Sequence, residues 1–459
     1  MSNQVERFAT KSASDIGRAI EQDRLDPREL AEYYRINAGA QNAIFSHVTA
    51  ERNRREAQAA WWRAKKGLRR GLLDGVPISW KDLYGIAHAP NECGSRLLSG
   101  QIAHQDCALA QRAARSGLPC LGKTHMSELA FSGLGINPIT QTSPNFFDST
   151  VAPGGSSSGA ASSVVFGCAA AAMGSDTGGS VRIPAAWNGL VGLKTSIGRL
   201  PMQGVLPLSP SLDTAGPLCR TIEDAARLFS VLDERPAIEL DGSSIKNARF
   251  VIPKTIVFDA CEPDRKTSFQ NDITAIENAG AQCEFVDFPE FQTLFELIAE
   301  NGAVVNTEGY AVWRDTIEAA PEKMYANILD RFRSGAQYRS DQSEKVKIIL
   351  VQLRRQVQER IAGYDGVLCP TTPNNPPNIE KLLADKSYYA EQNLLALRNT
   401  RIGNLLDLCA LTIPTRHTTG VFPGALMLSR ARNQEEALLR TGAALETTLG
   451  YHFHPQSCP

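Results

Sequence analysis

The sequence predicts an α/β protein that forms one large domain. Segments typical of strands alternate with amphipathic segments typical of helices from about residue 75 onward. The hydrophobic fraction of 42% is ordinary for a globular chain with a sizeable core. There is no internal repeat of fixed period and no low-complexity linker long enough to separate two domains. We therefore expect residues 1–459 to fold as a single unit.

The first 70 residues are predicted to be mostly helical. Residues 14–36 indicate two helices that are separated near Asp26-Pro27, because proline interrupts a continuous helix. Residues 49–66 form a charged amphipathic segment that predicts a third helix. We expect Trp61 and Trp62 of this helix to pack against the body of the protein.

Strands and helices are then expected in alternation. In residues 75–82, GVPISWKD, every second residue is apolar as in a strand, which ends at Lys81-Asp82. A helix is expected over residues 105–116 and a second strand over 118–125. The apolar run Val164–Gly174 is too short to span a bilayer, which takes roughly 20 residues, and is interpreted as a buried helix.

The second half of the chain continues the α/β pattern. We expect strands at 249–257, 282–288 and 364–371, and helices at 268–280, through most of 291–362, and at 433–447.

Charge and composition exclude several classes of partner and site. The formal net charge is −1 and the pI about 6.7, so nothing favours nucleic acid or a membrane surface as a partner. The charged N-terminus carries no apolar signal segment, which predicts a cytoplasmic protein. Ten scattered cysteines without a CxxC pair are expected to be reduced thiols. His452 and His454 are interpreted as part of a solvated tail, and no metal site is expected.

The segment APGGSSSGAASS, residues 152–163, has three interpretations: a phosphate-binding loop, a linker, or part of a catalytic site. A phosphate-binding P-loop requires the pattern GxxxxGK[ST], and this segment lacks the lysine. A flexible linker would not run directly into an alanine-rich apolar segment. We therefore interpret the segment as buried structure next to a site.

A second polar turn follows at Asp176-Thr177-Gly178-Gly179-Ser180. Consecutive glycines can direct several backbone N–H groups at one point, as an oxyanion requires, and place the Ser180 hydroxyl beside them. A serine hydroxyl requires a general base. The histidines here show no triad context, and there is no GxSxG motif. Lys81 is the alternative, because burial at the end of a strand lowers the pKa of a lysine.

Four segments together resemble the amidase signature family in order and spacing: GVPISWKD, LGKTHMSELAFSGLGINP, APGGSSSGAASS and GSDTGGSVRIPAAWNGLVGLKTSIGRLP. The resemblance is specific over residues 70–232 and looser from 233 to 459, which would hold the substrate pocket. It implies a large mixed β-sheet covered by helices on both faces.

The resemblance also implies a catalytic set of the Ser–cis-Ser–Lys type. Residue by residue, Ser180 would be the nucleophile, Ser156 the bridging serine after a cis peptide bond, and Lys81 the base. The oxyanion would be held by N–H groups of Thr177, Gly178, Gly179 and Ser180. Met126 and Ser127 resemble the substrate-side wall, although core packing is the alternative for both. No metal or organic cofactor is implied.

Charged residues near the motifs are interpreted separately. Asp176 and Arg182 are expected to form a structural pair, and Asp213 and Thr214 are also expected to be structural. The chain departs from the family pattern at 422–425, where the strand and closing helix should nevertheless persist. Residues 396–414 also differ and bring Arg398 and Arg401 near this region. An arginine in the pocket would favour a substrate with a carboxylate, whereas surface exposure is the alternative.

The expected function is hydrolysis of a linear amide, a small molecule, to an acid plus ammonia or an amine. Two enzymatic alternatives stay open: a partner-dependent glutaminase that resembles the A-type component of glutamyl-tRNA amidotransferase, and a hydrolase of a urea-derived substrate such as allophanate. The alternative from another class is a catalytically silent scaffold with the same fold, which intact Lys81, Ser156 and Ser180 disfavour. A homodimer is compatible with the sequence.

Overall fold

The computed structural model describes residues 3–416 and 420–451. Eleven strands lie in these residues: β1 Phe45–Val48, β2 Ile78–Lys81, β3 Cys120–Thr124, β4 Ala171–Asp176, β5 Val191–Lys194, β6 Thr214–Cys219, β7 Arg249–Pro253, β8 Gln282–Val286, β9 Gly366–Pro370, β10 Cys409–Thr415 and β11 Gly424–Arg430. The helices of the first half are α1 Asn3–Ala9, α2 Ala13–Glu21, α3 Pro27–Ala40, α4 Ala50–Lys65, α5 Ala108–Arg115, α6 Ser158–Val165, α7 Arg182–Trp187 and α8 Ile222–Leu232. Those of the second half are α9 Pro263–Asn278, α10 Pro289–Asn301, α11 Val304–Ala319, α12 Ala326–Arg333, α13 Ser340–Ile361, α14 Ile379–Ala384, α15 Lys386–Leu405 and α16 Glu435–Leu449.

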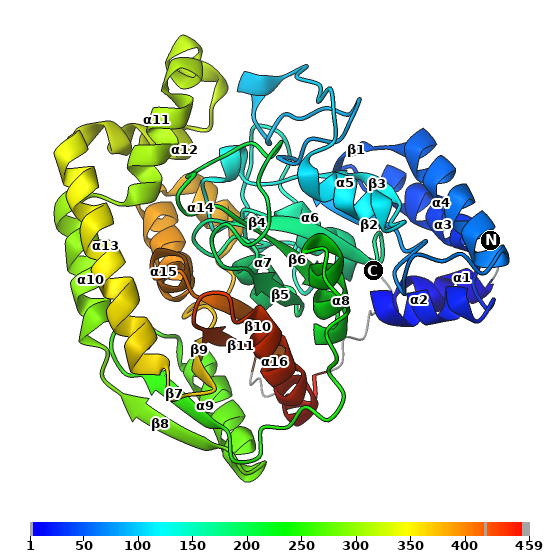
Figure 1. The fold of residues 1–459 in the computed structure, drawn as a ribbon. Helices are drawn as coiled ribbons and strands as arrows, with labels where there is room; N and C mark the ends of the chain where they lie inside the picture. Colours follow the sequence, from blue (N-terminus) through cyan, green and yellow to red (C-terminus); the bar gives the residue numbers. More distant parts are fainter. Residues whose placement is uncertain (1–2, 417–419, 452–459) are drawn as a thin grey trace.

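All eleven strands join one mixed sheet in the order β1-β3-β2-β4-β6-β5-β10-β11-β9-β7-β8. The strands β3, β2 and β4 run parallel, as do β9, β7 and β8, and the strands between β4 and β9 pair antiparallel. Figure 1 shows the sheet extending from β1, beside the N-terminal helices, to β8 at the other end of the molecule. The predicted mixed sheet is confirmed.

Helices cover both faces of the central strands. Helices α6 and α7 pack against β4 and β5, whereas α8 and α16 pack against β6 and β10. Successive residues of a strand point to opposite faces, and the neighbours Leu218 and Cys219 accordingly belong to different apolar clusters. Leu218 packs with Val164 of α6, and Cys219 belongs to the large cluster that includes Ile222 of α8. The central strands are therefore buried on both sides, which explains their apolar composition.

The N-terminal elements largely agree with the sequence. Two helices separated before Pro27 and a third over Ala50–Lys65 are present. Asp26 caps α3 by accepting a hydrogen bond from the Arg28 N–H, and Pro27 occupies the first helical position. The expectation for Trp62 was wrong, since its side chain is 53% exposed. Its neighbour Trp61 is stacked beneath the Arg28 guanidinium.

The interpretation of Val164–Gly174 as one buried helix was wrong. Helix α6 ends at Val165, and the chain turns through Gly167, which has φ +63°, before β4 begins at Ala171. Both parts are buried, and an apolar run cannot by itself distinguish a buried helix from a buried strand. The correction matters because β4 carries Ser175 and Asp176 into the site.

The C-terminal elements follow the predicted order: β11 begins within the departure at 422–425, and both β11 and α16 are intact. None of the helices in the described ranges combines the length and the apolar character that crossing a bilayer requires. Residues 3–416 and 420–451 also contain no disulfide.

Candidate active site

Parallel pairing of β2 with β4 brings Lys81 and Ser175 together at the same end of the sheet. The Lys81 ammonium nitrogen, Nζ, donates to Ser156 Oγ at 2.7 Å and to Ser175 Oγ at 2.8 Å. Ser156 arrives from the loop before α6, and the peptide bond between Gly155 and Ser156 is cis, as the resemblance implied. Three segments that are distant in sequence thus meet at one amine.

Lys81 is completely buried, and its environment favours the neutral amine. Burial lowers the pKa of Lys81 to about 7, although the negative charges around it, including Asp176 and Asp213, oppose this shift. No carboxylate forms an ion pair with Lys81 in the described part of the chain, and its two hydrogen-bond acceptors are hydroxyls. A neutral lysine at this position can accept a proton from Ser156.

Ser180 lies in the turn between β4 and α7, which one buried carboxylate organises. Asp176 accepts hydrogen bonds from the N–H groups of Gly179 and Val181 and from the Arg182 guanidinium. Burial alone would raise the pKa of Asp176, but Arg182 and the Asn404 amide more than offset it, and the pKa falls below its ordinary value. Asp176 and Arg182 therefore form the structural pair that was expected, with both side chains fully buried.

Helix α15 holds the same turn from the other side. Thr400 Oγ1 donates to the Gly178 carbonyl at 2.7 Å, and Asn404 Nδ2 donates to the Asp176 carboxylate at 2.9 Å. Gly179 has φ +139°, and a Cβ at this position would lie 2.2 Å from Thr400 Oγ1. Only glycine fits between the turn and this helix.

Three of the four predicted oxyanion donors have free N–H groups. The Gly179 N–H donates to Asp176 Oδ1 at 2.8 Å, so it is already engaged, and we remove Gly179 from the set of donors. The N–H groups of Thr177, Gly178 and Ser180 donate to no acceptor among the described residues. Thr177 is also held by its side chain, whose hydroxyl donates to Asp213 at 2.6 Å. Asp213 is structural in this arrangement, as predicted.

The loop that carries Ser156 and the turn that carries Ser180 are joined by their backbones rather than by the two hydroxyls. The Ser157 N–H donates to the Ser180 carbonyl at 3.2 Å. No hydrogen bond joins the Ser156 and Ser180 hydroxyls in the described structure. Catalytic hydrogen bonds are often long in a ligand-free enzyme and tighten when substrate binds.

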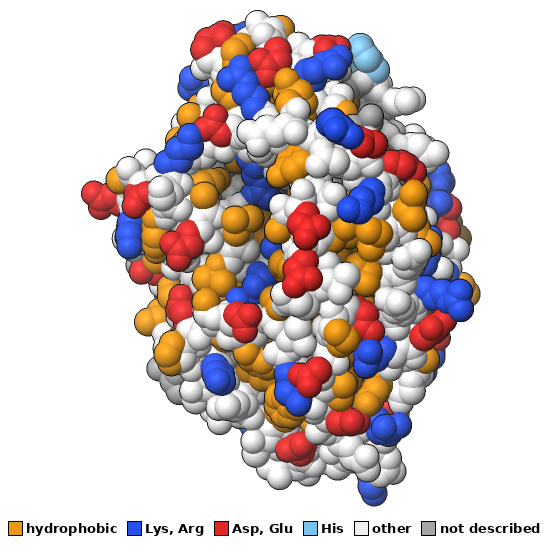
Figure 2. Space-filling model, turned by 90° about the vertical axis from the view of Figure 1, so that its left-hand side faces the viewer, with side chains coloured by type: hydrophobic (Ala, Val, Ile, Leu, Met, Phe, Trp, Pro, Cys, Tyr) orange, Lys and Arg blue, Asp and Glu red, His pale blue; other side chains and the backbone are white. Residues whose placement is uncertain are grey.

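Ser180, Thr177 and Gly178 line a cavity of about 460 Å³. Its other walls come from the loop at 130–132 and from helices α10, α11, α12 and α15. Figure 2 shows a hollow on this side of the molecule, bordered by hydrophobic side chains and with Lys or Arg side chains inside it. The arrangement is a partly open cavity in front of Ser180, with backbone N–H groups beside the serine.

Comparison with known proteins agrees with this geometry. Residues 30–439 match the Amidase family. A 2-amino-5-chloromuconic acid deaminase from Comamonas testosteroni is 34% identical over 384 residues, which is 83% of each chain. The A-type component of the glutamyl-tRNA(Gln) amidotransferase from Anaeromyxobacter sp. (strain K) is 28% identical over 98% of each chain. A crystal structure of an amidase superposes with a TM-score of 0.85 at 26% identity, covering 96% of this chain and 100% of the other.

The chain belongs to the Amidase family. It is an enzyme that hydrolyses amide C–N bonds, as expected. The family match covers both the signature segments and the later residues that form the cavity wall.

Of the two alternatives for Met126 and Ser127 of this amidase, the structure shows core packing rather than the substrate-side wall. Both side chains are fully buried, and neither lines the cavity. The Ser127 N–H donates to the Ser156 carbonyl, and its hydroxyl donates to the Ser132 carbonyl. They lie behind the wall that Ala130, Phe131 and Ser132 form, because the chain turns back at Leu129, which has φ +46°.

The two arginines of α15 that the sequence analysis named lie in different environments. Arg398 binds the backbone carbonyls of Val257 and Asp259, away from the cavity. Arg401, three residues later, lines the cavity, which is the pocket alternative that the sequence left open beside surface exposure. Arg331 of α12 lines it too, and sequence reasoning missed it because nothing near residue 331 relates it to a motif so much earlier in the chain.

Ser175 was also not identified from the sequence, although its position in the chain gave an indication. It immediately precedes Asp176 in a segment that is a strand rather than a helix, and strand pairing with β2 would have placed it near Lys81. In the described ranges, no group of three His, Cys, Asp or Glu side chains could hold a metal ion. His452 and His454 lie outside the described residues.

Proposed function

We propose that this amidase hydrolyses a linear amide through a seryl acyl-enzyme on Ser180, with Ser156 as proton relay and Lys81 as base. The observation that carries the proposal is the buried Lys81, whose Nζ lies 2.7 Å from Ser156 Oγ and whose pKa is lowered to about 7. Such an amine can hold one proton temporarily near neutral pH.

In the first half-reaction, Ser180 Oγ attacks the amide carbonyl carbon and forms a C–O bond. Its proton passes to Ser156, whose own proton passes to Lys81. The N–H groups of Thr177, Gly178 and Ser180 stabilise the oxyanion, each donor being worth about 2.7–4 kcal/mol in comparable enzymes. The C–N bond then breaks, and the proton returns through Ser156 to the leaving nitrogen.

In the second half-reaction, water attacks the acyl-enzyme. Its proton follows the same route to Lys81 and returns to Ser180 Oγ as the C–O bond to the serine breaks. The products are a carboxylic acid and ammonia or an amine, and the enzyme is regenerated. The relative from Comamonas testosteroni is named as a deaminase, so ammonia is the first product to measure.

The test is ammonia release from a panel of primary amides by the wild type and by Ser180→Ala, Ser156→Ala and Lys81→Ala. Each variant is expected to lose at least about 10³-fold in kcat/KM, because members of a catalytic set act as a unit. The matched control is Ser158→Ala, in the same segment, whose buried hydroxyl has no hydrogen-bond partner among the described residues. Activity that survives in Ser180→Ala would overturn the mechanism.

The panel includes glutamine and allophanate to separate the alternatives. A wild type that is silent on every amide, yet reacts at Ser180 with a fluorophosphonate probe, would favour a glutaminase that requires a partner protein. A protein that neither turns over substrate nor reacts with the probe would favour the silent scaffold. The cytoplasmic location stays a prediction.

A further inference from the structure

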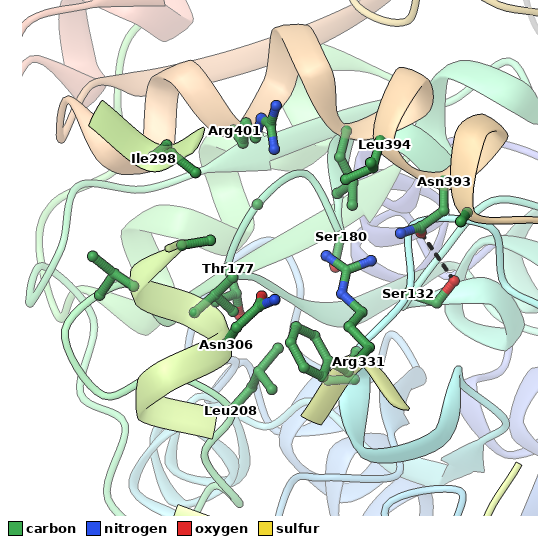
Figure 3. Close-up of a pocket in the computed structure, with 18 of the residues that line it drawn as sticks. Ser132, Thr177, Ser180, Leu208, Ile298, Asn306, Arg331, Asn393, Leu394 and Arg401 are labelled. Carbon is green, nitrogen blue, oxygen red and sulfur yellow. Dashed lines mark hydrogen bonds between the residues drawn. The ribbon is translucent and has the colours of Figure 1, made fainter. Parts of the chain in front are cut away.

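Two arginines from different helices enter the cavity that contains Ser180. Arg331 comes from α12 and Arg401 from α15. Figure 3 shows Arg331 reaching from below toward Ser180 and Arg401 on the opposite wall beside Ile298. Each guanidinium lies against an aromatic ring, 4.5 Å from the centroids of Phe131 and Phe295 respectively. Stacking of this kind holds the plane of a guanidinium and leaves its N–H edge free.

Neither arginine is neutralised by the protein. Within the described residues, no carboxylate forms an ion pair with Arg331 or Arg401. The acidic side chain in the cavity wall, Asp330, is paired with Lys386. Arg333 lies on the same helix as Arg331 but outside the cavity, and it forms an ion pair with Glu318. The cavity therefore holds two uncompensated positive charges.

The other polar groups of the wall are largely satisfied by one another. Asn393 accepts from the Ser132 hydroxyl and from the Gly133 N–H, and Tyr389 donates to Ser132. Asn306 donates to Ser334. In contrast, Arg401 Nε is buried without any hydrogen-bond partner among the described residues. Buried polar groups are normally paired, so a guanidinium in a cavity wall that keeps an unpaired N–H favours a ligand with acceptor atoms.

The electrostatics agree with an anionic ligand. Burial lowers the pKa of Arg401 to about 10, and the positive charges of Arg331 and Arg398 contribute to this shift. Burial likewise lowers the pKa of Arg331 to about 10. Both guanidiniums are still protonated at pH 7, and placing them in one cavity costs free energy in the empty enzyme. Carboxylates are the groups that guanidinium forks bind best, through paired charge-assisted hydrogen bonds.

We propose that the substrate is an amide whose acyl part carries two carboxylates, one bound by Arg331 and the other by Arg401. The inference rests on the proposed function, because the two arginines share the cavity of Ser180. Apolar side chains of the same cavity, such as Leu208, Ile298 and Leu397, would contact the carbon chain. Arg331 and Arg401 are thus specificity-determining residues rather than members of the proton relay.

The test uses three primary amides with the same six-carbon chain. They are hexanamide, which has no free carboxylate, the monoamide of adipic acid, which has one, and a monoamide of a tricarboxylic acid, which has two. Wild-type kcat/KM is expected to rise about 10-fold or more with each carboxylate, because each one adds charge-assisted hydrogen bonds to a guanidinium. Arg331→Gln and Arg401→Gln should each remove one of the two increments. In each variant the ratio of kcat/KM on the doubly anionic amide to kcat/KM on hexanamide should fall by about 10-fold, whereas a merely structural role would lower the rates on all three amides alike.

Matched controls separate charge, shape and folding. Arg333→Gln on α12 removes an exposed arginine outside the cavity and should change none of the three rates. Arg331→Lys and Arg401→Lys keep the charge and should recover part of the lost increment. Because an unpaired buried charge destabilises a protein, Arg401→Gln should keep or raise Tm, so a loss of selectivity cannot be attributed to unfolding.

Binding to Ser180→Ala, measured by calorimetry with the same amides, distinguishes the two proposals. Turnover without a carboxylate preference, or an optimum at one carboxylate, would overturn the two-site assignment and leave the proposed function standing. No turnover, together with tight binding of the doubly anionic amide that either arginine variant weakens, would support the site and overturn the proposed function. Equal binding of all three amides would also overturn the assignment.

Discussion

At the scale of single residues, the chemistry depends on how far each group is removed from water. Lys81 and Lys123 both lie in parallel strands and are both fully buried. Lys123 forms an ion pair with Asp82 at 3.1 Å, whereas the hydrogen-bond acceptors of Lys81 are two hydroxyls. An ion pair stabilises the charged amine, and hydroxyls do so less. The difference explains why Lys81 rather than Lys123 can act as a base.

The pH dependence of the activity should report the pKa of Lys81. The reactive form is the neutral amine, so kcat/KM on hexanamide should rise about tenfold per pH unit below pH 7 and level off above it, because burial lowers this pKa to about 7. Hexanamide is used because it does not itself titrate.

Burial also raises the pKa of Glu128 and of Glu446 to about 7 and that of Asp213 to about 6, and of these three Asp213 is the one bonded to the nucleophile turn, through the Thr177 hydroxyl. Measuring the profile of Asp213→Asn is the control. If the acidic limb disappears in that variant, the limb belongs to Asp213, and the role assigned to Lys81 loses its support.

Gly179 is predicted to be irreplaceable for a steric reason. Gly179→Ala would place a Cβ 2.2 Å from Thr400 Oγ1 at a residue with φ +139°. We expect a loss of about 1–3 kcal/mol in the free energy of unfolding, measured by urea denaturation. The neighbouring change Gly178→Ala is the control for stability, since its Cβ would have no neighbour closer than 3.6 Å. Equal stabilities of the two variants would contradict this account.

At the scale of elements, the nucleophile turn is held between β4 and α15. The Asp176 carboxylate joins the two by accepting from Arg182, from Asn404 and from the backbone of the turn. Thr400 of the same helix binds the Gly178 carbonyl. Since Arg401 follows Thr400 directly, α15 supports the nucleophile and also supplies a side chain to the cavity. This explains how the acyl pocket and the catalytic turn can be kept in a fixed relation.

Removal of the Asp176 charge should therefore be costly. Asp176→Asn leaves Arg182 buried without its counter-ion and should reduce the free energy of unfolding by about 3–5 kcal/mol. The same acid-to-amide change in the exposed pair of Arg355 and Glu359, Glu359→Gln, should cost no more than about 1 kcal/mol. Urea titrations of both variants give the comparison. Similar losses would mean that the buried pair is not what holds the turn.

At the scale of the whole molecule, one sheet connects the signature segments to the C-terminal pocket. Strand β10 pairs with β5 on one side and with β11 on the other, and thereby joins strands of the first half to β11 and β9. Leu411 of β10 is fully buried and packs in the large apolar cluster. The strands that carry Lys81 and Ser175 thus belong to the same continuous sheet as the strands of the C-terminal half.

A change at the centre of the sheet should affect the molecule as a unit. Leu411→Ala is expected to cost about 2–5 kcal/mol, as other buried leucine truncations do. The midpoints from tryptophan fluorescence and from circular dichroism should shift together. Ile348→Ala on α13, where the side chain is 55% exposed, should change stability by less than about 0.5 kcal/mol. Separate transitions in Leu411→Ala would show that the two halves unfold independently.

The sequence by itself was sufficient to select candidate site residues that lie in contiguous motifs, and their catalytic roles stay a prediction. Lys81, Ser156 and Ser180 could be named because the local pattern around each is distinctive, and the structure brings Lys81 and Ser156 into contact. Strand and helix order was also largely predictable, because periodicity is a local property. The exception was Val164–Gly174, because an apolar run shows no periodicity that would distinguish a helix from a strand. In the structure, this segment contains the end of α6 and the beginning of β4.

Tertiary structure alone decided the contacts between distant segments. Which N–H group of the turn is engaged depends on the Asp176 side chain, and which arginine enters the cavity depends on the packing of α12 and α15. Met126 and Ser127 lie behind the wall because of a turn at Leu129. Local sequence records propensity and spacing, whereas side-chain direction at a site is set by the packing of elements far apart in the chain.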